Sequence, residues 1–250
     1  MLDSTVKNII ASGETPLVLL HGFLESSTMW KHVQFPIGYP IVTIDLPGHG
    51  KSRDHDSGYS SIEEMAKEVI AVIDELQITN YHLIGHSMGG YVGLEVKRLD
   101  SRLDKVMLLN SNFWSDSSQK VQDRIRVSEI VQTNKSHFIY EVIPNLFLNP
   151  EKFDADVKDL IAEALEMPSM AIAKASLAMS ERVDFSEFVH ENAEDFTIVQ
   201  GVEDPIVSVS QMREKLEGVG INFTELEEVG HMAHFEAPER VQKIIKEFLS

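Results

Sequence analysis

The sequence predicts an α/β fold, in which helices cover both faces of a mostly parallel β-sheet. Six short apolar runs alternate along the chain with segments of helical periodicity. Most of these runs are continuously apolar, which is typical of parallel strands buried on both faces. The length of 250 residues and a hydrophobic content of 43% suit one substantial core.

The predicted elements follow one another in a regular order. The strands cover residues 16–20, 40–44, 81–84, 105–109, 196–199 and 221–226. Helices between and after them cover residues 61–76, 88–99, 209–216 and 238–249. This alternation makes an α/β sheet the leading architecture.

One long interval interrupts the alternation. Residues 113–194 contain no convincing strand, and four helical patterns succeed one another at 119–132, 135–148, 151–166 and 168–182. A crossover between two strands needs only one helix, so ordinary crossover helices are the weaker explanation. We therefore predict a core, residues 1–112 and 195–250, and an inserted helical cap, residues 113–194, over the strand ends.

Composition excludes several classes of function. Forty acidic against 22 basic residues give a formal charge of −18, which argues against nucleic acid or an anionic membrane as partner. The absence of cysteine rules out disulfides, thiolate nucleophiles and Cys-ligated zinc. The N-terminus lacks a signal-peptide pattern, and no apolar run approaches the ~18 residues that span a bilayer. We expect a cytoplasmic protein that acts on a small molecule, and the sequence predicts no oligomeric state.

The segment Gly85-His86-Ser87-Met88-Gly89 lies between a predicted strand and a predicted helix. Such a strand-turn-helix junction needs small residues two before and two after the serine, because its backbone is strained. Gly85 and Gly89 meet that requirement. The turn projects the hydroxyl of Ser87 away from the sheet, next to the unpaired N–H groups of a helix N-terminus. We predict that Ser87 is a nucleophile.

Two backbone N–H groups are candidates for an oxyanion hole. Phe23 follows His21-Gly22 just past a predicted strand, and Gly22 lets the chain turn so that the N–H of Phe23 faces Ser87. The N–H of Met88 is the second candidate. One such donor contributes about 3 kcal/mol to lowering an acyl-transfer barrier. The alternative for His21-Gly22 is a plain turn with a structural histidine.

An acid and a base follow later strands. Asp204 stands just past the strand at 196–199, and we prefer it to Glu203 because Pro205 fixes the turn after it. His231 lies on the loop after the last strand.

His234 competes with His231 for the role of base. We prefer His231 because Gly230 gives its loop freedom, whereas His234 lies nearer the final helix and fits a packing or capping role.

The chain order Ser87, Asp204, His231 is that of an α/β-hydrolase triad. With this order, the chain resembles the α/β-hydrolase fold superfamily from end to end. The motifs that carry the resemblance are residues 21–23, 45–52, 85–90, 201–204 and 230–231. The resemblance implies an eight-stranded, mostly parallel sheet, a site at the strand ends under a helical cap, and no cofactor.

Other chemistries fit the sequence less well. Gly50-Lys51-Ser52 imitates the end of a phosphate-binding loop, but that motif requires glycine where this chain has Asp45. His231 and His234 belong to no His-Glu-x-x-His helix, so we expect no metal. Dehalogenases and epoxide hydrolases of this fold carry an aspartate nucleophile, whereas here Ser87 occupies that position.

The main prediction is a serine hydrolase that cleaves a carboxylic ester or related acyl bond through an acyl-enzyme. The apolar cap, with Phe113, Trp114, Phe138 and Phe147, favours a small or medium apolar acyl group. The substrate itself is not fixed by fold and triad.

Three alternatives stay open. Carbon–carbon bond hydrolases have a similar triad and cap. Residues 21–26 are similar to those of the menaquinone-pathway cyclohexadiene carboxylate synthase, which eliminates pyruvate, although that family usually has glycine in place of Glu25. Its carboxylate-binding arginines would be sought in the cap, where Arg124 and Arg126 are available. The third alternative is a small-molecule receptor that retains the triad without turnover.

Overall fold

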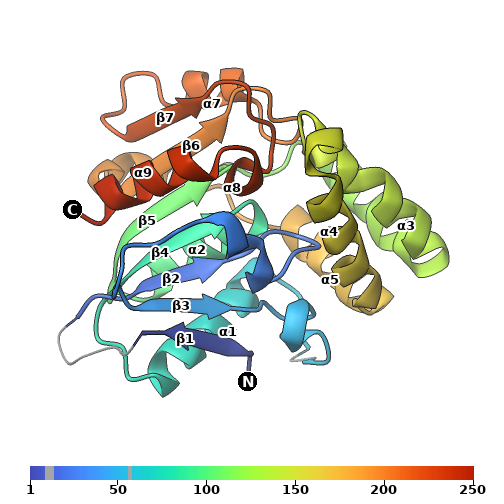
Figure 1. Ribbon diagram of the computed structural model, residues 1–250, viewed down its shortest axis with the longest axis horizontal. Coiled ribbons are helices and arrows are strands. Elements are labelled where there is room, and N and C mark those ends of the chain that lie inside the picture. The colour runs from blue at the N-terminus through green and yellow to red at the C-terminus, as the bar shows by residue number, and fades with distance from the viewer. Residues whose placement is uncertain (9–13, 56–57) are drawn as a thin grey trace.

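The computed structural model describes residues 1–8, 14–55 and 58–250, and its centre is a twisted sheet (Figure 1). The strands run in the spatial order β1-β3-β2-β4-β5-β6-β7. β1 pairs antiparallel with β3, and all the other neighbours are parallel. The strands are β1 (Ser4–Lys7), β2 (Leu17–Leu20), β3 (Ile41–Ile44), β4 (Tyr81–His86), β5 (Leu103–Leu109), β6 (Phe196–Gly201) and β7 (Asn222–Leu226).

Helices cover both faces of the sheet, as the apolar runs predict. Every residue of β2, β4 and β6 is buried. One face packs against α1 (Ile62–Glu75), α2 (Met88–Leu99) and α7 (Val209–Lys215), and the other against α9 (Pro238–Phe248). Local signals set the helix ends: the hydroxyl of Ser61 accepts a hydrogen bond from the N–H of Glu64, and Pro238 opens α9.

The sheet has seven strands within the described residues, one fewer than the resemblance implies. The strand β1 is the one that sequence patterning does not predict. Of its four residues only Val6 is apolar, and three of the four are exposed because the strand lies at the sheet edge. Edge strands carry little of the apolar signal on which such predictions depend.

The long interval between β5 and β6 is helical, with no strand in residues 113–194, all of which are described. It contains α3 (Ser118–Val142), α4 (Asp154–Glu166), α5 (Ser169–Ser180) and the short α6 (Ser186–Glu191). The helices predicted at 119–132 and 135–148 form the single helix α3, which ends at Val142, six residues before the predicted end. The break expected between them is a kink at Asn134, whose φ of −144° and ψ of 46° are not helical.

The inserted helices α3, α4 and α5 stand beyond the ends toward which the parallel strands point (Figure 1). Polar contacts fasten α4 to the core. The carboxylate of Glu163 accepts hydrogen bonds from the hydroxyls of Ser26 and Thr28, and Lys31 pairs with Asp156 at 2.8 Å. Helices from residues 113–194 therefore cover the carboxyl ends of the parallel strands.

A membrane span is not found in the described part of the chain: none of its helices combines the length and apolar character that crossing a bilayer requires.

Candidate active site

Ser87 occupies the sharp turn between β4 and α2. Its φ of 49° and ψ of −115° are strained for a residue with a side chain. Glycine on either side makes the turn possible: a Cβ on Gly85 would lie 2.3 Å from the carbonyl oxygen of Gly89, and one on Gly89 would lie 2.6 Å from that of His21. The strain orients the serine hydroxyl into a cavity under the inserted helices.

The predicted acid and base lie beside Ser87. His231 Nε2 is 2.9 Å from Ser87 Oγ, and His231 Nδ1 is 2.8 Å from Asp204 Oδ2. The three side chains come from the carboxyl ends of β4, β6 and β7, which meet at one edge of the parallel sheet. A carboxylate can only accept at neutral pH, so Nδ1 carries a proton and Nε2 is free to accept the proton of Ser87.

Asp204 is held by more donors than the sequence indicated. Its Oδ2 also accepts hydrogen bonds from the side-chain amides of Asn110 (2.9 Å) and Gln200 (2.8 Å), and Oδ1 accepts the N–H groups of residues 206 and 207. Burial alone would raise the pKa of Asp204, but the charge and hydrogen bond of His231 and these donors lower it to about 2.

Asn110 and Gln200 were missed in the sequence analysis. Each is a polar residue at the carboxyl end of a buried strand, and this position is the sequence feature that could have indicated a role in the site. The competing Glu203 lies apart from this network, because its carboxylate accepts the N–H of Val229.

The two predicted oxyanion donors are the backbone N–H groups of Phe23 and Met88. Phe23 lines the cavity and Met88 is the first residue of α2. No acceptor for either N–H is found within the described residues, so both groups are available to a ligand. His21 is structural: its Nε2 accepts the N–H of Leu46, and its Nδ1 donates to the carbonyl of Gly22.

A second buried carboxylate–histidine pair lies beside the first, with the ring centres of His86 and His231 5.0 Å apart. Glu25 Oε2 accepts the N–H of Gly22 at 2.6 Å and is 2.8 Å from His86 Nδ1. His86 Nε2 is 2.9 Å from the carbonyl oxygen of His231 and must donate to it. His86 Nδ1 and Glu25 Oε2 are close enough for a hydrogen bond, so a second proton lies between these two atoms. The neighbouring His234 Nε2 is 3.5 Å from Glu25 Oε1.

This extra proton makes the second pair an ion pair. Burial would raise the pKa of Glu25, but the charge on His86 lowers it well below its usual range. Burial would lower the pKa of His86, but Glu25 raises it. His234 behaves in the opposite way: burial, followed by the charge on His86, lowers its pKa to about 4. His234 is thus a neutral, packed side chain, in keeping with the role expected for it.

Glu25, His86 and His234 are also the one group of described residues whose geometry approaches a metal site, with ligand atoms within 4.8 Å of one another. A cation there would have to displace the proton between Glu25 and His86 and the N–H that Gly22 donates to Glu25. The residues fit a hydrogen-bonded cluster better than a metal site. That catalysis needs no metal or cofactor stays a prediction.

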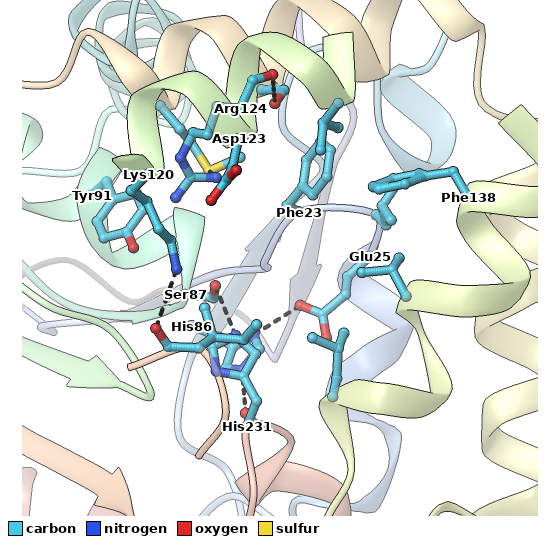
Figure 2. A pocket seen from close by; sticks show the side chains of 17 residues that line it. Phe23, Glu25, His86, Ser87, Tyr91, Lys120, Asp123, Arg124, Phe138 and His231 are labelled. Carbon is cyan, nitrogen blue, oxygen red and sulfur yellow. Dashed lines mark hydrogen bonds and ion pairs between the residues drawn. The ribbon is translucent and has the colours of Figure 1, made fainter. Parts of the chain in front are cut away.

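The cavity above Ser87 has a volume of 190 Å³ and mainly apolar walls. Figure 2 shows Ser87 and His231 at its base, with Phe23 and Phe138 above them. Of the four aromatic residues considered for the cap, only Phe138 lines it. The others are buried in the packed core: Phe113, Trp114 and Phe147.

The two arginines considered in the cap differ in position. Arg124 lines the cavity, whereas Arg126 is exposed and pairs with Asp123 on the surface of α3.

A sequence model described as "Alpha/beta hydrolase family" matches residues 17–243 of the chain. The chain belongs to the alpha/beta hydrolase family. The mostly parallel sheet and the position of Ser87 agree with that family's fold and elbow.

Individual relatives of this α/β hydrolase differ in activity. It is 28% identical over 246 residues to the dihydrolipoyllysine-residue acetyltransferase component of the acetoin cleaving system of Pseudomonas putida, covering 95% of the chain and 64% of that protein. The chain thus spans less than two thirds of this relative. It is 25% identical over 268 residues to the 2-hydroxy-6-oxononadienedioate/2-hydroxy-6-oxononatrienedioate hydrolase of Escherichia coli strain K12, covering 97% of the chain and 90% of that protein.

Among solved structures, this α/β hydrolase is similar to a thermophilic esterase from Thermogutta terrifontis with malate bound. The TM-score is 0.87 and the identity 26%, with 99% of this chain and 92% of that chain covered.

Proposed function

We propose that the protein is a serine hydrolase that cleaves a carboxylic ester or related acyl bond of a small molecule. The observation that carries the proposal is the hydrogen-bonded chain from Ser87 Oγ through His231 to Asp204, with distances of 2.9 and 2.8 Å, at the base of an apolar cavity. The similarity to the Thermogutta terrifontis esterase supports the same class of reaction.

In the proposed mechanism, His231 Nε2 takes the proton of Ser87 as Oγ attacks the substrate carbonyl carbon. The N–H groups of Phe23 and Met88 stabilise the negative charge on the carbonyl oxygen. His231 then gives the proton to the leaving alcohol, which leaves an acyl-serine. Water attacks this ester with His231 again as base, and the acid is released while Ser87 regains its proton.

Asp204 orients His231 and stabilises its charged form during both steps. Because its pKa is about 2, Asp204 keeps its negative charge throughout the neutral and mildly acidic range. The carboxylate therefore favours the Nδ1-protonated form of His231 that the reaction requires.

We propose that residues 113–194 act as a cap domain that selects the substrate, over a core of residues 1–112 and 195–250. The side chains of Val127, Phe138 and Val142 from α3 supply much of the apolar wall above Ser87. A volume of 190 Å³ lies below the ~300 Å³ at which pockets begin to hold drug-sized ligands. The cavity therefore suits a short acyl chain.

Steady-state hydrolysis of 4-nitrophenyl esters of increasing acyl length tests this proposal. With chelator present at neutral pH, we expect the wild type to turn over short esters and Ser87→Ala to lose about 10⁴-fold or more in kcat. Ser136→Ala, which removes an exposed hydroxyl on α3, is the matched control and should behave as the wild type. An undiminished rate in Ser87→Ala would show that Ser87 is not the nucleophile.

Carbon–carbon bond hydrolysis is the second candidate. The relative from Escherichia coli that is matched over nearly its whole length is named as a hydrolase of 2-hydroxy-6-oxo dienedioates, and such a reaction can use the same three side chains. Loss of every ester activity, together with turnover of a vinylogous 1,5-diketone by the wild type and not by Ser87→Ala, would favour it. Binding without turnover of either class would favour the receptor function.

A further inference from the structure

Lys120 is a charged residue of the cavity that the proposed mechanism does not use. It lies in the first turn of α3, and its amine extends toward Ser87 (Figure 2). Its one hydrogen-bond acceptor in the described chain is the carbonyl of Ile206, at 3.4 Å. Figure 2 also places Tyr91 on the side of Ser87 where Lys120 lies, and Phe138 on the opposite side.

The carboxylates near Lys120 are already engaged by other cations. Asp116 pairs with both Arg124, at 2.6 Å, and Arg182, at 2.7 Å, so one carboxylate serves two guanidinium groups. Asp123, which lines the cavity, pairs with Arg126. Arg124 and Asp123 line the cavity with Lys120, and each of them pairs with a residue other than Lys120. Asp204, which also acts on the charge of Lys120, pairs with His231.

The ammonium of Lys120 is costly in this position. Burial, followed by the charge on Arg124, lowers the pKa of Lys120. A carbonyl oxygen satisfies one of its three N–H donors, and no carboxylate forms an ion pair with it in the described residues. A bound anion would supply the missing counter-charge and acceptors, in a cavity whose walls are mainly apolar.

We propose that Lys120 binds a carboxylate of the substrate, so that the natural substrate is a small acid that also carries the acyl bond to be cleaved. This proposal rests on the proposed function, because it takes Ser87 as the position of the reacting carbonyl. Lys120 and the apolar side chain Phe138 lie on opposite sides of Ser87, so the carboxylate and the apolar part of the substrate extend in opposite directions.

Two matched pairs of esters test the proposal. Monomethyl glutarate and methyl pentanoate differ by a carboxylate on the acyl side. The esters 4-acetoxybenzoate and 4-acetoxytoluene differ by a carboxylate on the leaving-group side. The variants are Lys120→Met, which keeps the length of the side chain, and Lys120→Arg, which keeps the charge. Lys158→Met, an exposed lysine on α4, is the control.

In at least one pair, we expect Lys120→Met to lower kcat/KM for the carboxylate ester by about 10- to 100-fold, the range of a lost charge-assisted hydrogen bond. The neutral ester should change by less than about 3-fold. Lys120→Arg should retain most of the preference for the carboxylate ester over the neutral ester. Lys158→Met should retain all of that preference. Equal effects of Lys120→Met on both members of each pair would overturn the proposal.

A binding measurement separates this proposal from the assignment of Ser87. Calorimetry with the four esters on Ser87→Ala and on Ser87→Ala/Lys120→Met does not depend on turnover. Weaker binding of a carboxylate ester in the double variant supports the role of Lys120, even where no ester is hydrolysed by the wild type. Equal affinity of Ser87→Ala for both members of each pair would refute it, whatever the kinetics of Ser87 show.

Discussion

Two buried carboxylate–histidine pairs lie within one site, and they have the same length but different surroundings. Asp204 and His231 are 2.8 Å apart, as are Glu25 and His86. The free nitrogen of His231 meets the hydroxyl of Ser87 in the cavity, whereas that of His86 meets the carbonyl oxygen of His231. A hydroxyl can give up a proton and a carbonyl cannot. The pairs therefore differ in the partner of the histidine nitrogen that faces away from the carboxylate. Asp204 and His231 form a reactive pair, and Glu25 and His86 form a supporting pair.

The carboxylates of the two pairs also differ. Both oxygens of Asp204 are saturated by donors, but Glu25 Oε1 has no hydrogen-bond partner in the described structure. Glu25 therefore depends on His86 for its charge compensation, and His86 in turn holds the backbone of His231. We expect the pair Asp204–His231 to determine the rate of catalysis. We expect the pair Glu25–His86 to determine the stability of the folded protein.

The largest expected effect comes from Asp204→Asn. An amide at this position favours the wrong tautomer of His231, as in other serine hydrolases, so kcat should fall by about 10⁴-fold with little change in folding. Ester hydrolysis and urea denaturation at pH 7 measure the two effects. The adjacent Glu203→Gln is the control and should change kcat by less than about 3-fold. A comparable loss in that control would transfer the role of acid to Glu203.

Glu25→Gln tests the supporting pair. Removing one charge of a buried ion pair leaves His86 uncompensated, so the free energy of unfolding should fall by about 3–5 kcal/mol. The double variant Glu25→Gln/His86→Gln should recover part of this loss, because no buried charge remains. If Glu25→Gln kept its stability but lost as much kcat as Asp204→Asn, the second pair would share in the chemistry.

The smallest of the three effects is a change in the dependence of stability on pH. The pKa of His234 is about 4 in the folded protein, below the usual value of 6.5, so the unfolded chain binds the proton more readily. The contribution of neutral His234 to the free energy of unfolding is fully present above pH 6.5. About 3 kcal/mol of this free energy is lost as the pH falls toward 4. His86, with its raised pKa, acts in the opposite direction.

We therefore expect His234→Gln to reduce the loss of unfolding free energy between pH 7 and pH 4, measured by urea denaturation. The exposed His137→Gln on α3 is the control and should follow the wild type. A parallel pH dependence of His234→Gln and the wild type would mean that His234 is not a buried neutral side chain.

Much of the core was predictable because its signals are local. The six predicted strands match β2 to β7 to within two residues at every end, since most of them are continuous apolar runs. The failures have local causes too. The edge strand β1 has no apolar run, and the helix α3 continues through the break expected near Asn134.

The site was predictable to the extent that parallel strands bring their carboxyl ends together. Ser87, Asp204 and His231 each follow such a strand, so their proximity follows from fold class and chain order. The choice of His231 over His234 also had a local basis, in the glycine before it.

The sequence by itself determined the elbow at Ser87 and the order of the three side chains around it, because backbone strain and strand order are written in short segments. Only the tertiary structure decided that Glu25 would meet His86 and that Lys120 would enter the cavity. Glu25 and His86 stand 61 positions apart and share no periodicity or motif. Contacts of this kind depend on how the loops and the inserted helices pack over the sheet, which no local pattern encodes.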